Sequence, residues 1–167
     1  HIPTASIAKM ITAYVTFNAL RDKKVAVDQK DKVSPATWTK WNNMGSTMFL
    51  HSNESVSIDN LLFGVLTLSG NDASVVLAEG VHGNEAAFVA EMNIAAKKLG
   101  MTNTRFGNPN GWPDGGKTYS TARDLATLAQ AIILEHPKAF ERYFSQESFR
   151  WANVTQANRN PLLGAIE

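Results

Sequence analysis

Near its start the chain reads PTASIAKMITAYV (residues 3–15), and this stretch predicts an amphipathic helix. From residue 6 to residue 21, apolar side chains recur at spacings of three and four, the period of a helix with one buried face. Ser6 and Lys9 stand three positions apart and therefore share a face of this helix. The stretch thus predicts a helix over residues 6–21 that carries a serine and a lysine side by side at its N-terminal end.

The pairing of Ser6 with Lys9 fits a nucleophile and its base. A serine hydroxyl is a weak nucleophile that needs an adjacent base, and a lysine serves as that base only when burial or a nearby cation lowers its pKa. The N-terminal end of a helix adds partial positive charge and backbone N–H donors, which would stabilise an oxyanion beside Ser6. The tetrapeptide alone leaves a second interpretation open, in which Ser6 caps the helix and Lys9 is solvated.

A second polar group, Ser69-Gly70-Asn71, lies at a break between two apolar helices. Polar side chains buried at such a place are costly unless they are paired. The Ser69 hydroxyl is suited to relay a proton between Lys9 and a leaving amine, and the Asn71 amide is suited to contact a substrate backbone. A structural interpretation stays open here too, in which the serine and glycine end one helix and Asn71 with Asp72 caps the next.

The remainder of the chain predicts mostly helix. Apolar periodicity and capping residues predict further helices over residues 57–68, 72–81, 84–99, 121–135 and 139–144, with a short helical patch around residues 38–41. Residues 148–155 alternate apolar and weaker positions and are expected to form a strand. Residues 101–120 are a long loop rich in Asn, Gly and Pro, and a loop of that length in a compact domain is often functional.

The composition excludes several kinds of chemistry. The chain has 167 residues, 44% of them hydrophobic, which is enough to bury a core. It contains no cysteine, which rules out disulfides, zinc–thiolate sites and thiol nucleophiles. A formal net charge of +1 offers no basic field for nucleic acid. The four histidines show no metal-ligand spacing, so no metal site is expected.

The two serine motifs occur together with longer segments that carry a resemblance. These segments are residues 3–15, 45–50, 68–73, 108–111, 119–126 and 158–163. Together they resemble the low-molecular-mass penicillin-binding proteins, the serine-type D-alanyl-D-alanine carboxypeptidases of the D,D-peptidase and serine β-lactamase superfamily. The resemblance covers essentially the whole chain. It implies an α+β fold of the β-lactamase/transpeptidase type, of which this chain is mostly the helical lobe with most of the antiparallel sheet missing.

The resemblance also implies roles for four residues. Ser6 would attack the D-alanyl-D-alanine bond and form an acyl-enzyme, with Lys9 as the general base. Ser69 would pass a proton to the departing D-alanine, and Asn71 would bind a substrate amide. The implied partners are a peptidoglycan pentapeptide substrate and β-lactam inhibitors, and no metal or organic cofactor is implied. The implied location is periplasmic or otherwise extracytoplasmic, with the parent protein in some cases anchored to the cytoplasmic membrane.

The chain departs from the family pattern at both ends. The family's third motif is a Lys-Thr-Gly on a strand, whereas the one Lys-Thr here, Lys117-Thr118, is followed by Tyr119 and lies in the long loop. Only five residues precede Ser6, where the family has strands. We therefore expect residues 1–167 to be an incomplete D,D-peptidase catalytic domain, which a second fragment of the same protein would complete.

Other functions remain open alternatives. A catalytically incompetent fragment, or a module that binds penicillin or peptidoglycan, would keep the fold, although the four motif residues favour an enzyme. A β-lactamase would need a loop glutamate to activate the deacylating water, and residues 101–120 contain none. The four tryptophans are expected to pack in the core, and Trp112 is the one whose place in the long loop suits a functional role.

Overall fold

The computed structural model describes residues 2–160 and 162–163, so residues 1, 161 and 164–167 lie outside the described residues. The elements, in chain order, are η1 (Ala5–Ala8), α1 (Lys9–Arg21), β1 (Lys30–Lys32), α2 (Pro35–Trp41), β2 (Ser55–Ser57), α3 (Ile58–Leu68), α4 (Asn71–His82), α5 (Glu85–Lys98), α6 (Ala122–Glu135), α7 (Pro137–Phe144), β3 (Ser148–Trp151) and β4 (Val154–Ala157). The predicted mostly helical character is confirmed, and helices together with small antiparallel sheets fit the predicted α+β class.

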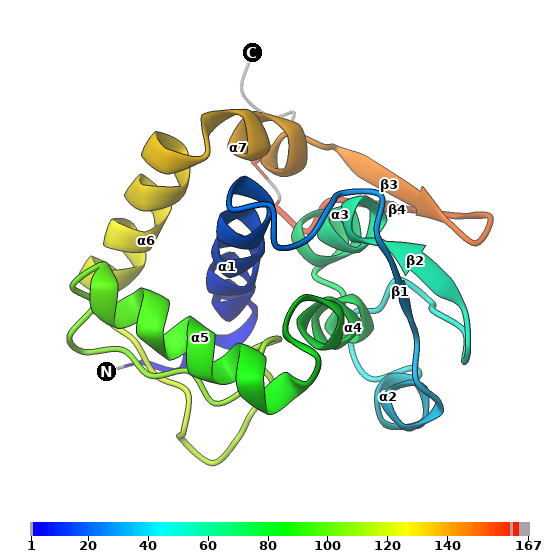
Figure 1. Cartoon of the computed structure of the whole chain (residues 1–167), viewed down its shortest axis with the longest axis horizontal. Coiled ribbons are helices and arrows are strands. Elements are labelled where there is room, and N and C mark those ends of the chain that lie inside the picture. Colours follow the sequence, from blue (N-terminus) through cyan, green and yellow to red (C-terminus); the bar gives the residue numbers. More distant parts are fainter. Residues whose placement is uncertain (1, 161, 164–167) are drawn as a thin grey trace.

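The central element is α1, which contacts α3, α4, α5 and α6 and is surrounded by them in Figure 1. It is buried on nearly all sides, because its apolar residues extend around the helix rather than along one stripe. Of its two fully buried threonines, Thr16 donates to the Thr12 carbonyl (2.9 Å) and Thr12 donates to the carbonyl of Pro109 (2.6 Å). The helix predicted over residues 6–21 is confirmed, with a 3₁₀ first turn, and the long loop is bonded to its middle.

The two apolar helices α3 and α4 pack against each other, and the break between them lies where the sequence predicts it. The hydroxyl of Ser57 caps α3 by accepting a hydrogen bond from the backbone N–H of Asn60 (3.2 Å). The helix ends at Ser69, whose φ of 56° is left-handed and stops the chain from continuing as a helix. Gly70 then precedes the first turn of α4, which places Asn71 directly at the start of that helix.

The strand prediction was wrong in one respect, because residues 148–155 are not a single strand. β3 and β4 form an antiparallel hairpin in which Ser148 pairs with Ala157 and Trp151 with Val154. The two residues between them, Ala152 (φ 48°) and Asn153 (φ 64°), both adopt the left-handed conformation of a two-residue hairpin turn. An alanine in that conformation is uncommon, which is why the turn leaves no clear signal in the sequence.

A second small sheet, formed by β1 and β2, was not predicted. Lys30, Asp31 and Lys32 pair antiparallel with residues 55–57. The sequence of this segment is typical of a charged loop. Its two lysines face solvent, while Asp31 is buried. Among the residues that the structure describes, no helix has the length and apolar character needed to cross a membrane.

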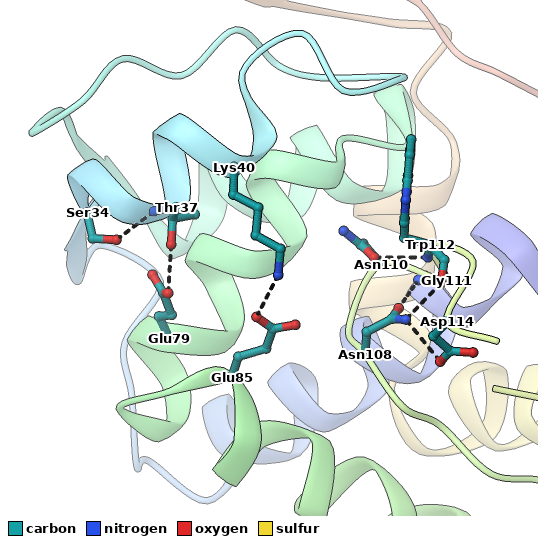
Figure 2. Close-up of polar contacts among 10 residues, drawn as sticks. All are labelled: Ser34, Thr37, Lys40, Glu79, Glu85, Asn108, Asn110, Gly111, Trp112 and Asp114. Atoms are coloured by element: carbon teal, nitrogen blue, oxygen red, sulfur yellow. Dashed lines mark hydrogen bonds and ion pairs between the residues drawn. The ribbon is translucent and has the colours of Figure 1, made fainter. Parts of the chain in front are cut away.

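The short helix α2 is attached to α4 and α5 by polar contacts (Figure 2). Thr37 donates from its hydroxyl to the carboxylate of Glu79 on α4 (2.7 Å), and Lys40 lies 4.0 Å from the carboxylate of Glu85 on α5. These contacts hold the last residue of α2, the buried Trp41, in place beside the long loop.

A close approach between Gly80 of α4 and Asp31 of β1 joins the helical core to the small sheet. A Cβ built on Gly80 would lie 1.9 Å from an Asp31 carboxylate oxygen and 2.0 Å from its Cγ. Real Cβ atoms do not reach such distances, so this helical position requires glycine despite the intrinsic cost of glycine inside a helix.

We predict that Gly80→Ala destabilises the fold by about 1–3 kcal/mol, because the added methyl group overpacks the contact with Asp31. In an exposed helix interior the same substitution stabilises by about 1 kcal/mol, so the predicted sign is reversed. Urea denaturation measures the effect. In an Asp31→Ala background the substitution should become neutral or stabilising, and an unchanged penalty there would contradict the account.

Candidate active site

The serine and lysine of the first motif lie together at the start of the central helix. Ser6 is exposed in the 3₁₀ turn η1, and Lys9 is the first residue of α1. The ammonium of Lys9 lies 3.2 Å from the Ser6 hydroxyl oxygen and donates a hydrogen bond to it. The structure therefore confirms that the two side chains share a face, and it excludes a solvated Lys9, which is 3% exposed.

The buried lysine is held by two further acceptors from distant parts of the chain. Lys9 Nζ donates to the side-chain oxygen of Asn71 (2.9 Å) and to the backbone carbonyl of Asn110 (2.7 Å). The orientation of the Asn71 amide follows from its other contact, in which its Nδ2 donates to the Met44 carbonyl (2.9 Å). Both partners facing Lys9 are therefore oxygen atoms that can only accept.

This arrangement has a chemical consequence for Lys9. A neutral lysine has two N–H donors and one lone pair. Because the oxygens of Asn71 and Asn110 take the two donors, the lone pair is directed at the hydroxyl of Ser6. Burial disfavours the charged form and lowers the pKa of Lys9 from 10.5 to about 8, while the carboxylate of Asp72 opposes part of that shift. The geometry thus provides an unprotonated amine next to a serine at mildly alkaline pH.

Of the four residues singled out in the sequence, the structure brings three together. Ser6, Lys9 and Asn71 form one connected group. Ser69 is half-buried at the left-handed end of α3, and among the described residues no hydrogen bond joins its hydroxyl to this group. The interpretation of Asn71 as a cap of α4 is wrong, because its side chain bonds to Lys9 and Met44 instead.

Asp72, which the sequence analysis considered only as a cap, has a larger part in the site. Its buried carboxylate accepts hydrogen bonds from the backbone N–H groups of Met48 (2.9 Å), Leu50 (3.2 Å) and Ala73 (2.8 Å). Burial raises the pKa of Asp72. The carboxylate ties residues 44–50 to the start of α4, the same segment whose Met44 carbonyl orients Asn71.

The long loop contributes to the site, as its length suggests, but through the Asn110 carbonyl and the turn at residues 108–111, whose roles sequence reasoning missed. Asn108 closes a turn by accepting from the Gly111 N–H (2.7 Å) and donating to the Trp112 carbonyl (2.9 Å), as Figure 2 shows. Gly111 has a φ of 74°, and a Cβ there would lie 1.8 Å from the Ala5 carbonyl oxygen. The turn therefore lies directly on the residue before Ser6, and only glycine permits that approach. The signal in the sequence is the Asn-Pro-Asn-Gly of residues 108–111.

A pocket opens beside the nucleophile where these segments meet. Its lining residues are Ala5, Ser6, Gly45, Ser46, Asn71, Asn110, Gly111, Trp112 and Pro113. Thr118, from the Lys-Thr dipeptide of the loop, is buried and bonded to Asp114, so that dipeptide stabilises the loop rather than this pocket. No cluster of three or more His, Asp or Glu side chains suited to a metal occurs within residues 2–160 and 162–163.

Comparison with known proteins identifies the family. The family model described as D-alanyl-D-alanine carboxypeptidase matches residues 1–166. The D-alanyl-D-alanine carboxypeptidases DacA of Haemophilus influenzae and DacC of Escherichia coli are 39% and 38% identical over 95% of this chain. The chain spans about 40% of the length of each of these two relatives.

Solved structures give the same result for the fold. Penicillin-binding protein 5 of Haemophilus influenzae superposes with a TM-score of 0.93 at 36% identity, over 98% of this chain and 47% of that one. Penicillin-binding protein 6B of Escherichia coli gives a TM-score of 0.91 at 37% identity, over 97% and 51%. Penicillin-binding protein D2 of Listeria monocytogenes in its cefotaxime-bound form gives 0.82 at 30% identity, over 99% and 66%.

We predict that Lys9 titrates at about pH 8, because burial raises the free energy of its charged form. Carbon-13 NMR of the lysine Cε atoms, with Lys9→Met used to assign the signal, measures the midpoint. A midpoint near 10.5, the value of a solvated lysine, would contradict the geometry described here.

We further predict that Asp72→Asn moves that midpoint to lower pH, because the substitution removes the negative charge that favours protonated Lys9. The same NMR titration measures the shift. Asp28→Asn, which removes an exposed acidic group, is the matched control and should leave the midpoint unchanged. A rise or no change with Asp72→Asn would show that the carboxylate does not act on Lys9.

Proposed function

The chain belongs to the D-alanyl-D-alanine carboxypeptidase family, and we propose that the protein containing it is a serine-type D-alanyl-D-alanine carboxypeptidase. It removes the terminal D-alanine from peptidoglycan stem pentapeptides through an acyl-enzyme, and penicillins acylate the same serine. The observation that carries the proposal is the buried Lys9 amine within hydrogen-bond distance of Ser6. The cefotaxime-bound form of a relative supports the β-lactam part.

The first chemical step follows from the lone pair on Lys9. Neutral Lys9 takes the proton of the Ser6 hydroxyl as its oxygen attacks the carbonyl carbon between the two D-alanines. The new bond joins Ser6 Oγ to that carbon, and the negative charge moves to the carbonyl oxygen. Asn71 and the Asn110 carbonyl stabilise the ammonium that forms, since both accept its hydrogen bonds.

The second step breaks the peptide bond. The C–N bond cleaves as the leaving nitrogen takes a proton, which Lys9 gives back by way of the Ser69 hydroxyl. In this structure that hydroxyl is not bonded to Lys9, so the relay requires the Ser69 side chain to turn toward the bound substrate. Water then adds to the ester carbon and frees Ser6. With a β-lactam the bond that breaks lies within the ring, so the leaving group stays attached to the acyl-enzyme.

We propose in addition that residues 1–167 form the helical part of the catalytic domain. The third motif, Lys-Thr-Gly, does not occur in the sequence, and the family uses it to receive the substrate carboxylate. The remaining strands and this motif are assigned to another part of the protein, in the same polypeptide or in a second fragment that completes the sheet. The 47% and 51% coverage of two solved relatives supports this assignment.

We place the protein in the periplasm or otherwise outside the cytoplasm, because peptidoglycan is extracytoplasmic, and membrane anchoring of the parent protein belongs to the same proposal. The competing function is a binding module, or a catalytically incompetent fragment, that holds penicillin or peptidoglycan without turnover. A β-lactamase is disfavoured because the loop next to Ser6 lacks a glutamate.

Labelling with a fluorescent penicillin tests the proposal. We predict covalent labelling of the whole protein at Ser6, its loss in Ser6→Ala, and normal labelling of Ser52→Ala, which changes a half-buried turn residue outside the pocket lining. The unlabelled whole protein should release D-alanine from a stem pentapeptide much faster than it hydrolyses penicillin. Labelling without D-alanine release supports the binding module, rapid penicillin hydrolysis supports a β-lactamase, and absence of labelling rejects the serine mechanism.

A further inference from the structure

Trp112 is the largest side chain in the lining of the pocket beside Ser6. It also lines a second, mainly apolar pocket, which is bounded by residues 3–5, residues 111–116 and Thr118. The two hollows adjoin at Trp112, and Ala5, next to the nucleophile, borders both. The ring is half-buried, so part of it faces these hollows while the rest is packed.

Both the backbone and the ring of Trp112 are held in place. Its backbone N–H donates to the side-chain oxygen of Asn110 (3.0 Å), and its carbonyl accepts from Asn108 (2.9 Å), as drawn in Figure 2. Its ring meets the buried Trp41 edge-on, with centroids 5.5 Å apart and planes at 78°. A Cβ on Gly45 would lie 3.1 Å from the indole, so the ring also rests on the backbone of that residue.

The position of the indole is coupled to that of the reacting groups. Asn110, which fixes the Trp112 backbone, also holds Lys9 through its carbonyl. Gly111 packs on the carbonyl of Ala5, one residue before Ser6. An apolar side chain that is already held in place in the pocket beside the nucleophile binds ligand atoms with little further loss of conformational entropy.

We propose that Trp112 is a specificity-determining residue, whose ring binds an apolar group attached next to the carbonyl that Ser6 attacks. The inference rests on the proposed acylation of Ser6. The acyl group of the preferred ligand then carries a flat or aliphatic substituent that packs on the indole. For β-lactams, the phenyl ring of benzylpenicillin is such a substituent.

The test compares two penicillins that differ only by that ring. Benzylpenicillin and 6-acetamidopenicillanic acid share the bicyclic nucleus and the side-chain amide, and only the first has a phenyl group. We expect Trp112→Ala in the whole protein to slow acylation by benzylpenicillin by about tenfold, the loss typical of a removed aromatic contact. Acylation by 6-acetamidopenicillanic acid should change less than twofold, and Trp112→Phe should fall between wild type and Trp112→Ala with benzylpenicillin.

Two controls separate recognition from damage to the site. The Lys9 titration midpoint should be the same in Trp112→Ala as in wild type, since the contact with the Asn110 carbonyl is unaltered. Trp151→Phe, on the β3–β4 hairpin and outside both pocket linings, should leave both rates unchanged. An equal loss with both penicillins, or no loss with either, overturns the inference, while continued acylation of Ser6 in either case leaves the proposed function standing.

Discussion

The arrangement of the site depends on one buried cation. Lys9 is almost fully removed from water, and its Nζ is stabilised by hydrogen bonds to the Ser6 hydroxyl, the Asn71 side chain and the Asn110 carbonyl and by the nearby Asp72 carboxylate. A buried ammonium without such partners would cost several kcal/mol. The need to pair the buried ammonium therefore holds each segment that supplies a partner close to Lys9. The pKa of Lys9 remains lowered, at about 8, because the cost of burying the ammonium exceeds the stabilisation that its partners provide.

Other features of the fold place those partners. The left-handed end of α3 at Ser69 and the following Gly70 start α4 at the point where Asn71 reaches the lysine. Asp72 then binds the backbone of residues 48–50, which belongs to the segment whose Met44 carbonyl orients the Asn71 amide. Gly111 allows the long loop to lie on Ala5, and so brings the Asn110 carbonyl to the lysine. The backbone conformations at these positions thus determine which side chains and carbonyls reach Lys9.

Local patterns were sufficient to predict much of this. The helix at residues 6–21, the cap at Ser57 and the i, i+3 spacing of Ser6 and Lys9 follow from short-range signals, and the structure confirms them. The prediction that α1 has one buried face was wrong, because the surrounding helices bury it on nearly all sides. The long-range contributions were not predicted. A backbone carbonyl such as that of Asn110 has no residue-type signature, and the role of Asp72 depends on where residues 48–50 lie in space. The hairpin turn at Ala152 was missed because its left-handed conformation is set by strand pairing rather than by residue type.

The central claim is that Lys9 acts as an uncharged base on Ser6, and the pH dependence of Ser6 acylation in the whole protein tests it most directly. The second-order rate constant for acylation by a penicillin reports the ionisation of the free enzyme. The account predicts that this constant rises with pH, has an inflection at about pH 8 where Lys9 loses its proton, and is constant above it. A rate that does not change through this range, or one that falls as Lys9 is deprotonated, would contradict the account.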